Sequence, residues 1–578
     1  MMNLARWPDT GLDVSRPQKA TITKFISKTE DKATHWWTAV FEDDHLEPKA
    51  DGYYVGAEIC VQPNASGWGW IFSGQVVGQA GDRLTIRTRN GGGEDGRQEV
   101  YAVGSRYALS NKKEMLTSPG EWFHDTQAGL LLLKPVGGTL AGKVVEAKRR
   151  DFGFDLTDRS FITVQGLSLF ACTLTTDRSA GGDAVGYNAD GSVRYPWRPA
   201  SWVAPAHDIV VDGLDVKYVN HFTDVSGHFI FQWPTATGVV IAGSDNVIRN
   251  CRIQYSAGNG ISLQGLRHKC LNNLILDTDY SAVDCAAIST GTSTMTRDVE
   301  IAYNTIDRTG RSGLTLRALE NSDGRNLVTR IHHNDVANFM LQDWDGGAFY
   351  VYGVDSKFVR IDHNRFHCDG TRDGLLFGAY WDFSKNYVFD HNVIWGVPIP
   401  IQVTQAFDND NTKINNLLIY NNTAETNNAM WSLAFGSVLN NGSVVQNNVF
   451  RAASFRDLKG TLVLRRPGYG TGAVTSQSNL VWGVPSNPGW TEGSPIPGDL
   501  YADDPGFVNA DGGDFHLTQT SPAVGAAVPL APVIRDGLTV PAYNDGTAGP
   551  GMDAGACELG GEDWKAGSTL AVRPPRHQ

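Results

Sequence analysis

A four-residue phrase centred on asparagine recurs through the middle of the chain. It reads YNTI around Asn304, HNRF around Asn364 and HNVI around Asn392. Its second position falls at residues 251, 273, 304, 334, 364, 392, 422 and 448, with cysteine in the first copy, so the steps are 22, 31, 30, 30, 28, 30 and 26 residues. A unit of this length buries its apolar face only by stacking on further copies of itself, which predicts a solenoid.

The repeats favour strands over helices. Each contains short β-type runs, such as VRIDHNRF and YVFDHNVIW, separated by Gly, Asn and Asp turn residues, and none shows a helical period. We therefore expect a right-handed parallel β-helix whose coils stack at roughly 4.8 Å. The recurring asparagines then form an internal ladder, each amide bonding to the coils above and below and satisfying turn groups that would otherwise be buried unpaired.

The flanks of the repeat differ from its centre. Residues 1–140 contain alternating strand patterns, such as DRLTIRTRN, and predict a β-rich, sandwich-like accessory domain packed on the first coils. Residues 141–460 are the expected β-helix, and residues 461–578 are expected to form the final coils and a C-terminal cap. The fold class is thus all-β.

Composition excludes several classes of protein. The chain has 49 basic and 62 acidic residues, a net charge of −13, and no Lys/Arg-rich stripe, which argues against nucleic acid as the main partner. No stretch is long and apolar enough to predict a membrane span. The seven scattered cysteines form no CxxC motif, so we expect neither a zinc site nor a complete disulfide framework.

The first residues, MMNLARWPDTG, lack a basic segment followed by an apolar core, so no secretory signal is predicted. A secreted or periplasmic location is expected only if the N-terminus is processed or trimmed. Whether the protein is a monomer or a homo-oligomer is left open.

The stretch DWDGGAFYVYG, residues 343–353, places two aspartates directly before a strand-like aromatic run. It aligns without a gap with the next repeat at an offset of 28 residues, which pairs Asp345 with Asp373 and Tyr352 with Tyr380. Residues in identical register on stacked coils are neighbours. Like charges stacked in this way are destabilising, so they need compensation by a cation, a metal, a shared proton or a catalytic use.

Two close carboxylates cannot both ionise freely, so one pKa rises and suits general-acid work. Rings beside such a pair stack on the apolar faces of sugars, so the composition of this stretch is typical of a carbohydrate site. The candidate catalytic residues are Asp345, Asp382 and Asp373. The candidate substrate-binding residues are Asp343, Trp344, Tyr350, Tyr352, Tyr380, Trp381, Arg317 and Arg372, and Arg311, Glu320 and Lys357 lie on nearby coils.

Two other uses of these aspartates are kept open. Asp-Gly is a common turn dipeptide, so Asp345 or Asp373 alone can be a turn former. A structural calcium ion could use the same carboxylate oxygens. No other metal and no organic cofactor is expected.

Several motifs together resemble a known family. They are NLARWP, SPGEWFHD with GLLLL, DGGAFYVYG, GAYWDFSKNYVFDHNVIW and DDPGFV. They resemble right-handed β-helix glycoside hydrolases, closest to glycoside hydrolase family 141, which includes α-L-fucosidase and xylanase activities, and more distantly the β-xylosidases of family 120. The resemblance implies that Asp345 and Asp382 are the catalytic pair. Gapless stacking places Asp382 against Val354, too far from Asp345 for the roughly 5–9.5 Å of a carboxylate pair unless a bend or bulge intervenes. Whether Asp373 or Asp382 partners Asp345 therefore stays open.

The leading hypothesis is a glycoside hydrolase that cleaves a plant or microbial glycan with two aspartates, in a groove on the β-helix. The first alternative is a polysaccharide lyase, which eliminates across a uronate with a Lys, Arg, His or Tyr base. The second is a glycan-binding protein resembling a phage tailspike.

Overall fold

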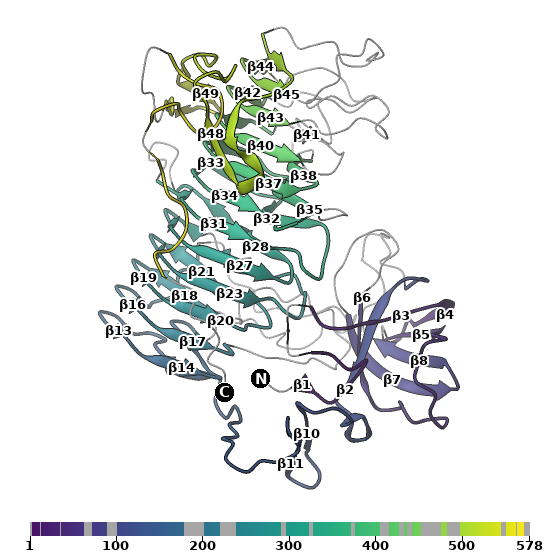
Figure 1. The fold of residues 1–578 in the computed structure, drawn as a ribbon. Helices are drawn as coiled ribbons and strands as arrows, with labels where there is room; N and C mark the ends of the chain where they lie inside the picture. The colour runs from purple at the N-terminus through teal and green to yellow at the C-terminus, as the bar shows by residue number, and fades with distance from the viewer. Residues whose placement is uncertain are drawn as a thin grey trace.

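In a computed structural model, the protein is an elongated stack of β-coils with a smaller β-domain at its side (Figure 1). The structure describes residues 3–11, 13–14, 16–34, 36–62, 72–88, 101–178, 201–219, 238–290, 296–322, 328–370, 376–404, 415–426, 433–435, 442–451, 475–482, 498–544, 551–561 and 563–570. None of the helices in these ranges is long and apolar enough to cross a membrane.

Three parallel sheets run the length of the stack, and each coil contributes one strand to each of them. Sheet 1 contains, in order, β12 (Phe152–Asp155), β15 (Thr173–Thr175), β18 (Val239–Ser244), β21 (Ile261–Leu266), β24 (Ala286–Thr290), β28 (Ser312–Thr315), β32 (Gly346–Tyr352), β35 (Leu376–Asp382), β38 (Ile399–Val403) and β41 (Leu433–Phe435), with β25 (Thr296–Arg297) and β29 (Leu319–Glu320) beside them.

Sheet 2 contains β13 (Thr163–Gln165), β16 (Val210–Asp212), β19 (Val247–Arg249), β22 (Lys269–Leu271), β26 (Glu300–Ala302), β30 (Arg330–His332), β33 (Asp355–Asp362), β36 (Lys385–Asp390), β39 (Leu417–Tyr420), β42 (Val444–Gln446) and β44 (Thr475–Gln477). Sheet 3 contains β14 (Ser168–Phe170), β17 (Asp215–Lys217), β20 (Arg252–Gln254), β23 (Leu274–Thr278), β27 (Thr305–Thr309), β31 (Asp335–Ala337), β34 (Arg365–His367), β37 (Val393–Val397), β40 (Thr423–Thr426), β43 (Val449–Arg451), β45 (Leu480–Trp482) and β46 (Leu500–Ala502). This is the predicted parallel β-helix.

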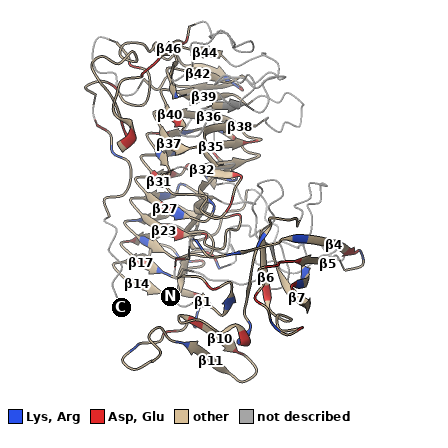
Figure 2. Cartoon of the chain, turned by 45° about the vertical axis from the view of Figure 1, so that its right-hand side comes forward, with Lys and Arg blue, Asp and Glu red and all other residues tan. Residues whose placement is uncertain are grey.

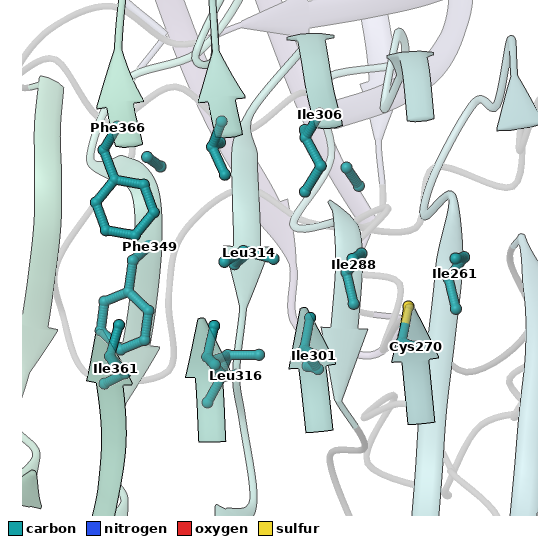
Figure 3. Close-up of a cluster of buried hydrophobic side chains, with 14 of the residues drawn as sticks. Ile261, Cys270, Ile288, Ile301, Ile306, Leu314, Leu316, Phe349, Ile361 and Phe366 are labelled. Carbon is teal, nitrogen blue, oxygen red and sulfur yellow. The ribbon is translucent and has the colours of Figure 1, made fainter. Parts of the chain in front are cut away.

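The core lies inside the coils, where the inward side chains of the three sheets meet. Figure 3 shows part of it, with Ile288, Leu314 and Phe349 in one row above Ile301 and Ile361 in the next. Because successive coils place branched aliphatic side chains at equivalent positions, these side chains form continuous apolar columns. Stacking therefore buries the apolar face of each repeat, as the spacing of the repeats requires.

The asparagine ladder is confirmed. The side-chain amide of Asn364 donates to Asn392 Oδ1 at 2.9 Å and to the carbonyl of Ile331 at 3.0 Å, and its backbone N–H donates to the same Asn392 oxygen. The same pattern joins residues 273, 304, 334, 364, 392, 422, 448 and 479. The ladder thus extends one step beyond the last copy of the predicted phrase and ends on Asp499, whose Oδ1 accepts from Asn479 at 2.9 Å.

The first 140 residues form two further sheets, both largely antiparallel. One contains β2 (Arg6–Trp7), β9 (Arg106–Ser110), β6 (Glu58–Gln62), β7 (Phe72–Ala80), β8 (Arg83–Thr88), β5 (Trp36–Glu42) and β4 (Lys24–Asp31), with β3 (Ala20–Thr21) on β9. The other contains β1 (Asn3–Leu4), β10 (Glu121–Asp125) and β11 (Leu130–Lys134). The larger sheet stands beside the coils in both Figure 1 and Figure 2. It contacts them through Arg308, whose guanidinium is 2.7 Å from Asp13, and through the segment that precedes β32.

The register between β32 and β35 differs from the sequence alignment. Tyr350 pairs with Tyr380 and Tyr352 with Asp382, an offset of 30 residues. The predicted offset of 28, which pairs Tyr352 with Tyr380 and Val354 with Asp382, is therefore wrong in sheet 1. The offset becomes 28 only within β33 and β36, where Asp362 pairs with Asp390. Two extra residues are absorbed near Lys357 and Phe358, which both take left-handed backbone conformations with φ of 53° and 63°.

The C-terminal part covers the upper coils and returns along the stack (Figure 1). It contains two hairpins, β47 (Phe507–Asn509) with β48 (Asp514–Leu517), and β49 (Val533–Arg535) with β50 (Leu538–Val540). Beyond them, Gly567 donates its N–H to the carbonyl of His333 at 2.8 Å, and Thr569 to Asn272 Oδ1 at 2.8 Å. The seven cysteines are all free, and five of them are buried.

Candidate active site

The two faces of sheet 1 have different roles at β32 and β35. Phe349 and Trp381 belong to the solenoid core, whereas Tyr350, Phe377 and Tyr380 pack into a separate cluster with Ile399. Since successive side chains of a strand point to opposite faces, the two tyrosines lie on the outer face of the sheet. The candidate carboxylates lie at the two ends of this outer face, Asp345 directly before β32 and Asp382 at the end of β35.

Arg311 holds the segment that leads into β32. Its guanidinium lies 3.4 Å from Asp343 Oδ2 and 3.7 Å from Asp284 Oδ1, and it donates to the backbone carbonyl of Asp345 at 3.0 Å. Arg317 pairs with the other oxygen of Asp284. Arg311, Asp284 and Asp343 are completely buried. A guanidinium therefore provides compensating charge for the aspartates on whose stacking the sequence analysis depends.

Burial also changes which of these acids are ionised. It raises the pKa of Asp343 to about 6, against the opposing effect of Arg311. It raises the pKa of Asp345 to about 7, where Arg311 again opposes and the charge of Asp382 adds to the rise. Burial also raises the pKa of Asp279 well above its usual range, and its Oδ2 atom has no hydrogen-bond partner. Near neutral pH, Asp345 is thus divided between its acid and its carboxylate, the condition that suits a general acid.

Asp382 lies among hydroxyl donors. Tyr350 donates to its Oδ2 atom at 3.3 Å, and Thr404 donates to its Oδ1 atom at 2.8 Å. Tyr380, from the same strand, also hydrogen-bonds to this carboxylate. Hydrogen bonds to the charged form of a carboxylate favour that form. The two candidate acids therefore have environments that separate their protonation states.

Residues 216–368 match the family model for a right handed beta helix region. Similar solved structures include one described as a glycoside hydrolase, with 12% identity, a TM-score of 0.41, and 76% of this chain and 75% of that chain covered. Another is the catalytic unit of a thermostable GH87 alpha-1,3-glucanase from Streptomyces thermodiastaticus strain HF3-3, with 10% identity, a TM-score of 0.26 and coverages of 87% and 96%. A third is the tailspike protein gp49 from Pseudomonas phage LKA1, with 9% identity, a TM-score of 0.20 and coverages of 80% and 67%. No curated protein matches the sequence.

Within this right-handed β-helix, most of the predicted substrate-binding residues surround the two acids. Tyr350 and Tyr380 lie between them, and the pKa of both phenols is raised by burial and by Asp345 and Asp382. Tyr352 is 45% exposed at the end of β32, beside the ring of Phe383.

Other predicted residues have different surroundings. Trp381 is buried in the core, 5.2 Å from Phe349 and 4.9 Å from Phe389 between ring centroids, so its position does not fit the predicted contact with a sugar. Lys357 and Glu320 pair with each other at 2.9 Å. Asp373 and Arg372 lie outside the described residues.

The sequence analysis missed several residues of the site. Asp284 precedes β24 by two residues, much as Asp343 precedes β32 by three, so the shared position before a strand of sheet 1 was the available signal. Thr404 directly follows β38 and lies on the coil after Asp382. Neither carries a motif, and both are recognised only once the register is known.

A metal alternative can be compared with the donor sets in the described residues. Asp43, Asp44 and His45 are the described acid and histidine groups whose ligand atoms lie within 4.8 Å of one another, and two of the three side chains are exposed on the N-terminal domain. The acids around Asp343 contact Arg311 and Arg317 instead. Guanidinium groups therefore stand where the calcium alternative would place an ion.

Proposed function

We propose that the protein hydrolyses glycosidic bonds on the outer face of sheet 1, with Asp345 as general acid and Asp382 as its partner. The observation that carries the proposal is the pair itself. Two nearly buried aspartates at the two ends of one sheet face influence each other electrically, and two tyrosines lie between them. Glycosidases use such a pair of carboxyl groups on either side of the scissile bond.

The role of Asp345 follows from its surroundings. A general acid must hold a proton near neutral pH and release it to the glycosidic oxygen. Burial raises the pKa of Asp345 to about 7, so a large fraction of the carboxyl groups carries the proton. The left-handed backbone of Asp345, with φ of 66°, is a conformation that aspartate tolerates better than most residues.

Asp382 suits the opposite role. The hydroxyls of Tyr350 and Thr404 stabilise its charged form, which can activate water or attack the anomeric carbon. The rings of Tyr350 and Tyr380 offer apolar faces on which a sugar can stack.

Elimination from a uronate has less support. That reaction needs a base and a cation that neutralises the substrate carboxylate. Burial raises the pKa of both Tyr350 and Tyr380, which makes them poor bases, and Arg317 already pairs with Asp284.

The test is product release from a panel of fucosylated, xylan, arabinan and pectic glycans, with reducing ends and ultraviolet absorbance both recorded. Wild type is compared with Asp345→Asn and Asp382→Asn. Asp355→Asn is the matched control, because its exposed carboxylate lies on the same coil and contacts Asn386 and Lys385.

New reducing ends that disappear in both site variants and persist in the control would support the proposal. Absorbance of an unsaturated uronate would identify a lyase and overturn it. Release that survives in Asp345→Asn would remove this aspartate from the mechanism.

A further inference from the structure

The segment that carries Asp343 and Asp345 contacts the N-terminal domain as well as the coils. The backbone carbonyl of Gln342 accepts a hydrogen bond from Gln62 Nε2 at 2.6 Å and another from Arg106 Nη2 at 3.1 Å. These donors come from β6 and β9, which lie side by side in the larger N-terminal sheet. A domain more than two hundred residues away in sequence thus holds the residue next to Asp343.

Three further contacts fix the same segment. Lys19 donates to Gln62 Oε1 at 3.1 Å, and so supports the side chain that reaches Gln342. The guanidinium of Arg106 lies 5.8 Å from the ring centroid of Trp344. From the other side, the side chain of Gln342 donates to the carbonyl of Tyr280 at 2.8 Å, on a neighbouring coil.

The charges are arranged in the same way. Asp343 has Arg311 on the solenoid side, and Lys19 on the domain side lowers its pKa in the same direction. Arg106 is also close enough for its charge to respond to Asp343. Asp343 therefore lies between cations from two domains, two residues before the proposed general acid.

We propose that Lys19 and Arg106 are positioning residues of the active site, which hold the Gln342–Asp345 segment from the N-terminal domain. This inference rests on the proposed function, because it concerns the placement of Asp345 for glycoside hydrolysis. Neither side chain touches the reacting atoms; both act through Gln342, Asp343 and Trp344. The N-terminal domain is then part of the catalytic unit.

The experiment uses the full chain and two matched pairs of variants. Lys19→Met and Arg106→Met remove the cations at the segment. Lys24→Met and Arg83→Met make the same substitutions in the same sheet, where the side chains are 65% and 53% exposed and pair with Glu42. All four variants are measured for kcat, KM and the pH profile on the glycan that wild type cleaves.

We expect kcat to fall by about tenfold to a hundredfold in Lys19→Met and Arg106→Met, with little change in KM, because a small displacement of a reacting group costs this much. The pH profile of Lys19→Met should also move. Burial lowers the pKa of Lys19 to about 7, and the charged groups that face it are Arg106, Asp343, Cys60 and Arg6. Loss of this cation raises the pKa of Asp343, so the acidic limb of the profile shifts to higher pH. Equal profiles and rates in the site and control variants would overturn the inference.

A second readout does not need activity. Backbone hydrogen exchange of peptides that span residues 342–352 should be faster in Arg106→Met than in Arg83→Met, because only the former loses the bond to Gln342. If wild type cleaves no glycan but this difference is present, the proposed function fails and the positioning contact stands. If exchange is the same in both variants, the positioning role is overturned whatever the activity.

Discussion

The hydroxyl of Tyr350 lies 3.3 Å from Asp382 Oδ2, although the two residues belong to neighbouring coils. Tyr380 contacts the same carboxylate from its own strand, and Thr404 contacts it from the coil that follows. Asp382 thus accepts hydroxyl donors from three successive coils. The parallel register of β32, β35 and β38 brings these donors together.

Tyr350→Phe tests this arrangement directly. The substitution removes one donor from the charged form of Asp382 and keeps the ring, so the pKa of this aspartate rises. We expect kcat to fall by about tenfold, which corresponds to the roughly 1.5 kcal/mol of a hydrogen bond to a charged group. Steady-state kinetics would measure it, with Tyr303→Phe as control, since that phenol is 42% exposed away from the acids. An unchanged kcat in Tyr350→Phe would mean that this hydroxyl does not support the carboxylate.

The pH dependence of kcat/KM reports the protonation of Asp345 in the free protein. Its pKa is raised to about 7, mainly by burial, and a general acid must be protonated. The rate should therefore be lost as pH rises through about 7, by about tenfold per pH unit above it. A rate that stays flat well above neutral pH would contradict the assignment of Asp345 as the acid.

The same shift predicts how stability changes with pH. Because the pKa of Asp345 is raised on folding, its contribution to stability is fully present below the ordinary value near 3.8 and is lost as pH rises through about 7. Asp345→Asn cannot ionise. The variant should therefore gain unfolding free energy over wild type above neutral pH, by at most roughly 4 kcal/mol, and the difference should shrink in acid. Denaturant unfolding at both pH values would measure it, and a difference independent of pH would show that this carboxyl does not carry the shift.

Arg311→Met should destabilise the protein far more than loss of a surface arginine. It leaves Asp284 and Asp343 buried without this guanidinium, which costs about 3–5 kcal/mol for a buried pair. Arg267→Met removes an exposed pair with Asp245 and should cost about 0–1 kcal/mol. Urea denaturation compares the two. Equal losses would mean that Arg311 does not compensate the buried acids.

The repeat and its ladder could be predicted from sequence because one residue type recurs at one place in every coil. Asn364 and Asn392 pair at the offset of 28 that their phrases share. The register in sheet 1 could not be predicted in this way. Identities after Val359 follow the true offset of 28, and extending them backward ignores the two residues absorbed near Lys357.

The site itself was predicted in part, through the carboxylate and tyrosine types of one stretch. Asp284 and Arg311 come from earlier coils, and Lys19 and Arg106 come from another domain. Their meeting at Asp343 depends on how two sheets pack, which no local pattern in the sequence records. Arg311 was noticed only as a basic residue on a nearby coil, with no indication that it would be buried.

Asn364→Ala tests the ladder. It removes the donors to Ile331 and Asn392 and the acceptor for the preceding coil. Because each buried polar group left unpaired costs about 1–3 kcal/mol, we expect a loss of about 3 kcal/mol or more in unfolding free energy. Thermal and urea unfolding would measure the loss. A loss below about 1 kcal/mol would mean that water replaces the amide.

The change of offset between β32 and β33 separates two functions of one coil. Two additional residues near Lys357 shift the partners in sheet 1, yet Asn364 still meets Asn392 in the ladder. Residues can thus be added or removed at the rim of a coil while its spine keeps step. A chain of this kind could acquire new substrates by changes in length at its rim, and designers could graft such segments between coils without redesigning the interior.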